Sequence, residues 1–318
     1  MMLARSASLG RLLAPRLMMA AGAHGSALHS VARVAVPQPP QAQQPNFGGE
    51  VARLYGDFFV QLRPSWERHV EAVAQHIAPA PMTILDIASG PGQPAMLLAQ
   101  RFPAATVLST DLAPDMVAQA ASSVAAAGLA GQVSCSTMDM QDMAAVGSGT
   151  CDVVTASYGL MFAPELPRAL SEVHRVLRPG GYLVTTVWRT MPMMSLVGEV
   201  MAAVLGHSPP PPPINPMSLS EDIALDGPLA AAGLQLVTEE SGSISFDLGT
   251  DPDRQWRLGT ITVLPKLQEL AEAGTHGDNV MEKARDAFIA ATAGWKDPAT
   301  GSVILPPATY RLVVCRKA

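Results

Sequence analysis

Between residues 82 and 188, short apolar runs alternate with longer segments of mixed apolar and polar residues. The short runs predict buried strands, because each is only a few residues long and is bounded by turn-forming residues. The predicted strands are MTILDI (82–87), TVLSTD (106–111), VSCST (133–137), CDVVTAS (151–157) and YLVTTVW (182–188). The segments between them predict helices over 93–102, 114–128 and 164–177. This alternation predicts a parallel sheet covered by helices on both faces.

The segments on either side of this alternation predict further elements. Before it, residues 47–60 and 65–78 predict two helices that are broken at Pro64. After it, the sequence predicts helices over 195–205, 251–273 and 279–293, and one more helix that ends at Gly233. It also predicts β segments over 234–240, 244–246 and 309–316. The five prolines at 209–213 predict a surface loop, with a proline-rich ligand as the less favoured interpretation.

The first 49 residues differ in composition from the rest, since they contain four arginines and no Asp or Glu. This composition, rich in Ala, Ser and Leu, is typical of an organellar transit peptide. We expect a mitochondrial destination, with the plastid as the alternative. The other interpretation of this segment is a plain disordered tail without a targeting role. Residues 37–45 are rich in Pro and Gln and predict an extended linker. We therefore expect a transit peptide and linker over 1–45 and one domain over 46–318, with insertions capping the site within 190–300.

The composition of the whole chain limits the function further. Its 318 residues are 48% hydrophobic and 15% charged, which suits a large globular core. The net charge of −6 and the lack of a basic stripe disfavour a nucleic-acid partner. No uninterrupted apolar run reaches 18 residues, so we expect no transmembrane helix. The three cysteines are far apart and lack metal-ligand spacing, so we expect no metal site.

The stretch LDIASGPGQPA (85–95) follows the first predicted strand and can be interpreted in two ways. Gly90, Gly92 and Ala95 match the G-x-G-x-x-[GA] pattern of dinucleotide sites. Asp86 favours another ligand, because its carboxylate would repel a pyrophosphate and attract an ammonium group. The N–H groups at the start of the next helix would suit a carboxylate. An amino acid has both groups, and so does S-adenosylmethionine.

Further candidate residues follow the later strands. A carboxylate at Asp111 can accept hydrogen bonds from a ribose diol, which NAD and S-adenosylmethionine both contain. Asp139 and Met140 could contact an adenine, with Met116 on its other side; a loop residue and a core residue are the alternatives for Asp139 and Met116.

The fourth strand ends at Ser157 and Tyr158, whose hydroxyls should reach the reacting end, and strand-end capping is the alternative for both.

The ordered set LDIASGPG, STDLAPDM, TMDMQDM, CDVVTASYGLMF and RVLRPGGYLVTTVW resembles the class I S-adenosylmethionine-dependent methyltransferases. More narrowly, it is similar to the group that includes the ubiquinone/menaquinone C-methyltransferases (methyltransferase type 11). The resemblance implies an α/β, Rossmann-like, doubly wound sheet of seven strands with the last strand antiparallel. Segments 234–246 and 309–316 could supply the final hairpin, and helical elements at the N-terminus and after the fifth strand would cap the sheet.

The resemblance also implies roles for individual residues. Asp86, Gly90 and Gly92 would hold the methionine part of the cofactor, and Asp111 would hold the ribose. Asp139 with Met140 would contact the adenine. Ala88, Leu112, Met116 and Ser157 complete the expected cofactor-binding set.

Two positions depart from the family pattern. Ala88 stands where relatives often have Gly, and a methyl group tolerates only a negative φ easily, so we expect a slightly altered loop and an intact site. Ala113 stands where a Ser or Thr often caps the helix, and the missing cap should cost about 1 kcal/mol.

Methyl transfer from a sulfonium is an in-line displacement that needs alignment and exclusion of water more than a fixed catalytic triad. Tyr55, Ser157 and Tyr158 are weak candidates for a catalytic role, and the histidines are candidate bases by residue type only. The region after residue 190 contains Met191, Met193, Met194, Met201, Trp256 and Trp295, which predicts a roof over a small apolar or aromatic acceptor. The alternatives are a methyltransferase-like mitochondrial assembly or scaffold protein and, less favoured, an NAD-dependent oxidoreductase. The oligomeric state and the acceptor stay open.

Overall fold

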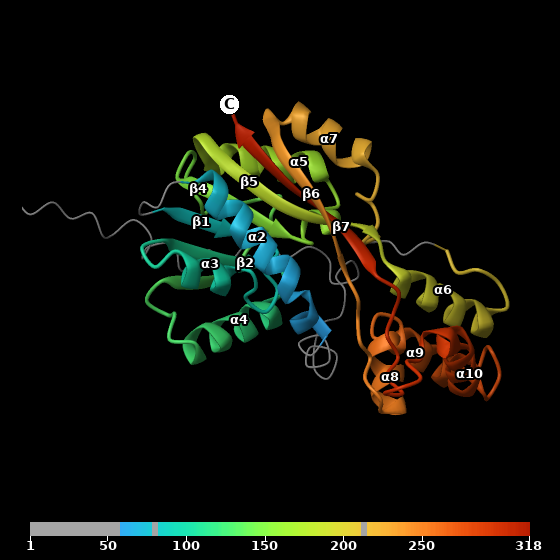
Figure 1. Ribbon diagram of the computed structural model, residues 1–318. Helices are drawn as coiled ribbons and strands as arrows, with labels where there is room; N and C mark the ends of the chain where they lie inside the picture. The colour runs from blue at the N-terminus through green and yellow to red at the C-terminus, as the bar shows by residue number, and fades with distance from the viewer. Residues whose placement is uncertain (1–57, 78–81, 211–214) are drawn as a thin grey trace, which may run out of the picture. The chain divides into compact units, whose positions relative to one another are not determined.

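The computed structural model of the chain describes residues 58–77, 82–210 and 215–318. A seven-stranded sheet forms its centre, with strand order β3-β2-β1-β4-β5-β7-β6 (Figure 1). The strands are β1 (Thr83–Asp86), β2 (Thr106–Asp111), β3 (Val133–Thr137), β4 (Cys151–Ser157), β5 (Leu177–Thr190), β6 (Leu234–Ile244) and β7 (Ala308–Lys317). Strands β1 to β5 pair in parallel, and β7 pairs antiparallel with both β5 and β6. The predicted doubly wound sheet with an antiparallel last strand is confirmed.

The parallel strands owe their place in the middle of the sheet to apolar side chains on both faces. Ile84 and Leu85 are consecutive residues of β1 and point to opposite faces, and both are fully buried. Val153 and Val154 in β4 are buried in the same way. Strand β6 lies at the edge of the sheet and carries mostly polar, partly exposed residues, as a strand open to water should.

Helices cover both faces of the sheet (Figure 1). One face carries α2 (Arg63–His76), α3 (Ala95–Arg101) and α4 (Pro114–Ala126), and the other carries α5 (Leu166–Val176) and α7 (Asp222–Ala231). Helix α5 buries Ala169, Leu170, Val173 and Val176, which the helical period places on one side. Helix α4 begins at Pro114 as predicted, and its N-cap residue Ala113 makes no side-chain cap bond.

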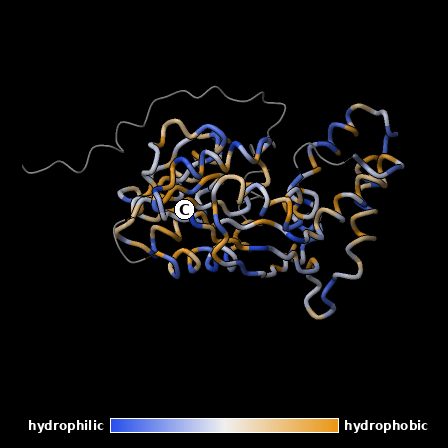
Figure 2. Tube along the Cα trace, turned by 90° about the horizontal axis from the view of Figure 1, so that it is seen from above, coloured by the Kyte–Doolittle hydropathy of each residue, from blue (hydrophilic) through white to orange (hydrophobic). Residues whose placement is uncertain are grey.

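Four further helices form a helical lobe beyond the carboxyl end of β5 (Figure 1). They are α6 (Pro192–Leu205), α8 (Pro252–Gly259), α9 (Leu264–Ala273) and α10 (Val280–Thr292). Helix α6 follows β5, whereas the other three lie in the chain between β6 and β7. The rings of Trp256 and Phe288 meet edge to face at 5.6 Å inside this lobe. Figure 2 shows hydrophobic positions recurring along the elements of both the sheet and the lobe.

Several element boundaries differ from the sequence predictions. The helix predicted over 251–273 is two helices, α8 and α9, because Pro265 lacks an N–H and its ring obstructs a continuous helix. Strand β5 begins at Leu177, ahead of the predicted start at residue 182. The β segments predicted over 234–240 and 244–246 are one strand, which ends at Ile244. Helix α3 begins at Ala95 and has seven residues.

Some predictions fall on residues that the structure does not describe. The transit peptide and linker (1–45), Tyr55 and part of the proline run at 209–213 lie outside the described residues. Within the described ranges, no helix is long and apolar enough to cross a membrane.

Candidate functional site

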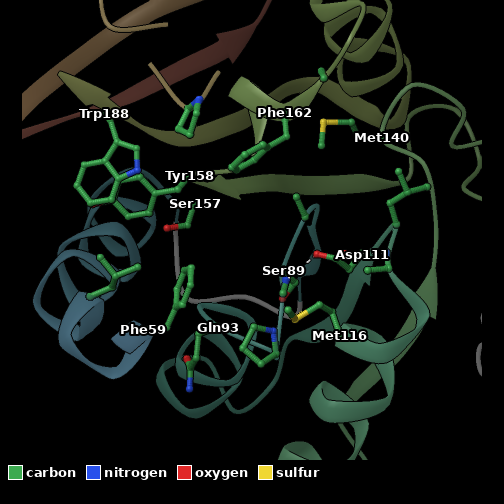
Figure 3. A pocket seen from close by; sticks show the side chains of 18 of the residues that line it. Phe59, Ser89, Gln93, Asp111, Met116, Met140, Ser157, Tyr158, Phe162 and Trp188 are labelled. Carbon is green, nitrogen blue, oxygen red and sulfur yellow. Dashed lines mark hydrogen bonds between the residues drawn. The ribbon is translucent and has the colours of Figure 1, made fainter. Parts of the chain in front are cut away.

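A cavity lies at the carboxyl ends of the parallel strands, where the sheet topology predicts a ligand site (Figure 3). One part, which we call the acidic end, is lined by residues after β2 and β3: Asp111, Leu112, Ala113, Met116, Met138, Asp139, Met140 and Gln141. The other part, which we call the aromatic end, is lined mainly by large apolar side chains: Phe58, Phe59, Leu62, Trp66, Tyr158, Phe162, Trp188, Met191, Met193, Met194 and Ile261. The loop after β1 lines the cavity with Ala88, Ser89, Gly90, Pro91 and Gln93.

Asp111 is the central polar group of the acidic end. Its Oδ2 accepts a hydrogen bond from the Gly90 N–H at 2.9 Å, and its Oδ1 accepts one from the Ala113 N–H at 2.9 Å. Burial raises the pKa of this carboxyl above its ordinary value, and the backbone hydrogen bonds oppose the shift. A carboxylate has about four acceptor sites. Asp111 therefore keeps capacity to accept from a diol while it holds the Gly-rich loop.

The remaining residues of the acidic end lie where the sequence predicts. Leu112, Met116, Asp139 and Met140 all line the cavity. Figure 3 shows Met116 and Met140 on either side of Asp111 in the view. Asp139 also accepts a hydrogen bond from the Gln141 N–H at 2.8 Å, so it shapes its own loop as well. Both interpretations of Asp139, as a loop residue and as a wall of the site, fit its position.

Ala88 adopts a conformation that we did not expect. Its φ of +51° lies in the left-handed region, so the expectation that it keeps a negative φ and alters the loop is wrong. For an alanine this conformation costs roughly 1 kcal/mol. Gly159, on the neighbouring segment, leaves the space that Ala88 needs, because a Cβ on Gly159 would lie 2.8 Å from the Ala88 Cβ.

The backbone N–H groups of the loop after β1 are already engaged. The N–H of Ser89 donates to the Thr110 carbonyl, and that of Gly90 donates to Asp111. The N–H groups of Gly92 and Gln93 both donate to the Ser89 carbonyl, and Pro91 has none. These four N–H groups are therefore not free donors for an anion, because the loop folds back on itself and on β2. This observation counts against a pyrophosphate at this place.

Asp86 lies behind the wall of the cavity rather than on it. Its side chain is fully buried, and its Oδ1 accepts a hydrogen bond from the Thr155 hydroxyl at 2.6 Å. Its Oδ2 is buried without a hydrogen-bond partner. Burial raises the pKa of this carboxyl from 3.8 to about 6. Asp86 can therefore act on a bound cation through its electric field.

The aromatic end is a wall of stacked and edge-packed rings. The rings of Tyr158 and Trp188 are stacked with centroids 4.0 Å apart, and Tyr158 has a φ of +55° (Figure 3). Burial raises the pKa of the Tyr158 phenol well above its ordinary value, so the phenol is protonated at neutral pH. Ser157 lines the cavity, and its hydroxyl is buried without a partner. Among the described residues that line the cavity, none is Lys, Arg or His.

The predicted roof is only partly in place. Met191, Met193 and Met194 line the cavity, together with Ile261 and Thr262 from the turn between α8 and α9. Met201, Trp256 and Trp295 are not part of the cavity wall. They lie in α6, α8 and the turn after α10, and Trp256 packs inside the lobe. Helical periodicity identified apolar faces here, but it did not show which face meets the cavity.

None of the four candidate histidines of the described chain (His69, His76, His174 and His207) lines the cavity. His69 is a buried residue of α2, and its Nδ1 is 3.0 Å from the Thr186 hydroxyl in β5. Burial lowers its pKa from 6.5 to about 3, so the imidazole is neutral at physiological pH. Within the described residues, no group of three or more His, Cys, Asp or Glu side chains could hold a metal ion.

Residues 84–181 match a protein-family model described as a methyltransferase domain. Demethylmenaquinone methyltransferase from Thermus thermophilus is 38% identical over 119 residues, which cover 37% of this chain and 52% of that protein. This region is a class I S-adenosylmethionine-dependent methyltransferase domain. Ubiquinone/menaquinone biosynthesis C-methyltransferase UbiE from Geotalea daltonii is 30% identical to this chain over 108 residues, which cover 34% of this chain and 46% of that protein.

The chain spans about half the length of these curated relatives. Among solved structures, the YcgJ protein from Bacillus subtilis matches this chain with a TM-score of 0.50 at 16% identity, covering 79% of this chain and 98% of that one. This likeness shows the fold alone. The comparisons support neither the oxidoreductase nor the scaffold interpretation.

Sequence reasoning missed several residues that line the site of the methyltransferase domain. Gln93 stands inside the stretch that attracted attention for its glycines, and Gln141 follows Met140 directly. Phe162 follows the end of β4, and Trp188 lies near the carboxyl end of β5, where any side chain is a candidate by position. Their place after strand ends was a usable signal for all but Phe59 and Ile261, which reach the cavity from elements outside the alternating strands and helices.

Proposed function

We propose that the protein transfers the methyl group of S-adenosylmethionine to a small, uncharged, apolar or aromatic acceptor. The observation that carries this proposal is the division of one cavity into an acidic end and an aromatic end. A nucleoside needs hydrogen-bond acceptors and a flat apolar slot, which the first end has. An apolar acceptor needs a wall without charged groups, which the second end has.

The residues of the acidic end fit the adenosine half of the cofactor. Asp111 would accept hydrogen bonds from the ribose hydroxyls, and Asp139 would accept one from the adenine amino group. Met116 and Met140 would contact the faces of the ring. Asp86, behind the loop, would favour the α-ammonium group through its charge. When bound, S-adenosylmethionine supplies a methyl group that its sulfonium has already activated.

The protein's own part in the reaction is positioning and exclusion of water. Tyr158 can donate a hydrogen bond to an oxygen atom of the methyl acceptor, but its protonated phenol is not a base at neutral pH. With no Lys, Arg or His among the described lining residues, the acceptor should bring a nucleophilic atom that needs no strong base. Ser157 and Tyr158 are therefore positioning candidates for the acceptor.

The names of the relatives support a ring-bearing acceptor. The relative from Thermus thermophilus is named for demethylmenaquinone, and the one from Geotalea daltonii for the quinones ubiquinone and menaquinone. A quinone-like or other aromatic ring would suit the stacked wall of Tyr158 and Trp188. We propose this acceptor class and no particular molecule.

Isothermal titration calorimetry with S-adenosylhomocysteine and with NADH tests the cofactor. We expect micromolar binding of the first and none of the second, and tight NADH binding alone would reverse the proposal. Transfer of a radiolabelled methyl group into an apolar extract of the host's organelles tests the activity. Cofactor binding without any labelled product would favour the scaffold interpretation instead.

We also propose that residues 1–45 direct the protein to mitochondria, with the plastid as the alternative. The acid-free, arginine-containing composition of this segment supports the proposal. A fusion of residues 1–45 to a fluorescent protein should be imported into mitochondria. A diffuse cytosolic signal would contradict the proposal, and a plastid signal would select the alternative.

A further inference from the structure

The loop after β1 lies where the amino-acid end of S-adenosylmethionine would bind, and many of its polar groups are already hydrogen-bonded within the protein. In the loop after β1, the N–H groups of Ser89, Gly90, Gly92 and Gln93 all donate hydrogen bonds within the protein. Helix α3 starts only at Ala95. These four N–H groups are therefore already satisfied, and binding a ligand through them would require breaking these bonds.

The polar side chains that line the cavity near this loop differ in how far they are satisfied. The Ser89 hydroxyl accepts a hydrogen bond from Ser109 at 2.8 Å, and the Asp111 carboxylate accepts two from the backbone. Gln93 and Ser157 differ from them, because the Gln93 amide oxygen and the Ser157 hydroxyl are buried without a partner. A buried polar atom without a partner is costly and rare in folded proteins, unless a ligand satisfies it.

Gln93 lies at the right place for the amino-acid end. It lines the cavity from the loop that also presents Gly90. In Figure 3, Gln93 and Ser157 lie on one side of the view, whereas Asp111, Met116 and Met140 lie on the other. The side chain is therefore separated from the residues that suit the nucleoside.

We propose that the Gln93 amide oxygen accepts a hydrogen bond from the α-ammonium group of S-adenosylmethionine, so that Gln93 is the side chain that recognises the amino-acid end of the cofactor. This inference rests on the proposed methyltransferase function. An amide oxygen can accept a charge-assisted hydrogen bond from an ammonium donor. The Asp86 carboxylate, buried behind the loop, reinforces the preference for a cation.

Two ligands that differ only at the amino-acid end test the proposal. S-adenosylhomocysteine contains the α-ammonium group, and 5′-methylthioadenosine has the same nucleoside and sulfur without it. Calorimetry on the full chain measures both dissociation constants for the natural protein, Gln93→Met, Gln93→Glu and Gln141→Met. Gln141 is the matched control, because it lines the acidic end and hydrogen-bonds to Asp139.

We expect Gln93→Met to weaken S-adenosylhomocysteine about 10- to 100-fold and to leave 5′-methylthioadenosine unchanged. Gln93→Glu keeps an acceptor oxygen and should bind S-adenosylhomocysteine at least as tightly as the natural protein. Gln141→Met should change the two affinities by the same factor.

Equal weakening of both ligands by Gln93→Met, or no weakening of either, would overturn the inference and leave the proposed function standing. Weaker S-adenosylhomocysteine binding by Gln93→Glu than by Gln93→Met would also overturn it. A natural protein that binds neither ligand would overturn the proposed function, and the inference with it. Unfolding curves verify that each variant is folded, and Gln93→Glu serves alone if Gln93→Met is not.

Discussion

At the acidic end of the cavity, Asp111 is the last residue of β2, and Asp139 and Met140 lie in the loop after the neighbouring strand β3. At the aromatic end, Phe59, Met191 and Ile261 come from three segments that lie far apart in the chain. The first arrangement follows from the sheet alone, because parallel neighbours bring their carboxyl ends to one edge. The second depends on how the segment before α2 and the helical lobe pack. One end of the cavity is therefore determined by the sheet, and the other end by the packing of elements outside it.

The largest expected effect is a loss of stability at the aromatic end that leaves cofactor binding at the acidic end nearly unchanged. Trp188→Ala removes the ring stacked on Tyr158 and should lower the free energy of unfolding by about 3–5 kcal/mol. The affinity for S-adenosylhomocysteine should change little, because Asp111 and its loop are untouched. Urea unfolding and calorimetry measure the two quantities, and Trp188→Phe is the milder control. An equal loss of cofactor affinity in both variants would show that the ends are not independent.

The pH dependence of stability compares two buried groups that lie outside the cavity wall, Asp86 at the end of β1 and His69 in α2. The pKa of Asp86 is raised from 3.8 to about 6 in the folded protein, so its contribution to stability is present below pH 4 and is lost as the pH rises to about 6. The full change is roughly 3 kcal/mol. The pKa of His69, beside β5, is lowered from 6.5 to about 3, so its contribution is present above pH 6.5 and is lost as the pH falls.

The two contributions have opposite slopes between pH 4 and 6 and should largely cancel in the natural protein. Asp86→Asn should therefore make stability rise more steeply with pH across this window, and His69→Gln should make it fall. Denaturant unfolding at half-unit pH steps gives both difference curves against the natural protein. Parallel curves for all three proteins would show that neither group titrates as its burial implies.

A change at Asp111 probes the acidic end directly. Asp111→Ala removes the expected ribose acceptor and the partner of the Gly90 and Ala113 N–H groups, so S-adenosylhomocysteine binding should weaken by roughly 1–3 kcal/mol. Asp115→Ala, on the exposed side of the first turn of α4, is the control and should bind normally. Unchanged affinity in Asp111→Ala would show that the ribose contact is wrongly assigned.

The smallest expected effect concerns the contact between Ala88 and Gly159. Gly159→Ala should cost about 1–2 kcal/mol of stability, because its Cβ would lie 2.8 Å from that of Ala88. Ala88→Gly should itself stabilise the left-handed position by up to about 1 kcal/mol and should largely rescue Gly159→Ala. A double-mutant cycle by urea unfolding measures the coupling. If the stability changes of the two single variants add up to that of the double variant, the two positions are not coupled.

The sequence predicted the alternation of strands and helices from local patterns, and the family resemblance implied the seven-stranded sheet with its antiparallel last strand. Asp111, Leu112, Met116, Asp139 and Met140 meet at one cavity as predicted. The engaged N–H groups after β1 were not predictable in the same way. They depend on where the Asp111 carboxylate and the Ser89 carbonyl come to lie in three dimensions.

The aromatic end shows the same limit more strongly. Apolar periodicity predicted α6, yet it could not distinguish Met193, which meets the cavity, from Met201, which packs inside the lobe. Pro265 was a visible signal for the break between α8 and α9, and the prediction of one helix passed over it. That break matters for the site, because Ile261 reaches the cavity from the turn that it creates.

The position of β7 has a consequence for how the protein is made. This strand comes after all other described elements in the chain, yet it lies between β5 and β6 in the sheet. During synthesis, β5 and β6 must therefore wait with unpaired edges until residues 308–317 have left the ribosome. Helices α8 to α10, which carry Ile261, are attached to that same late segment. A nascent chain halted before β7 should expose unpaired strand edges and should be bound by chaperones.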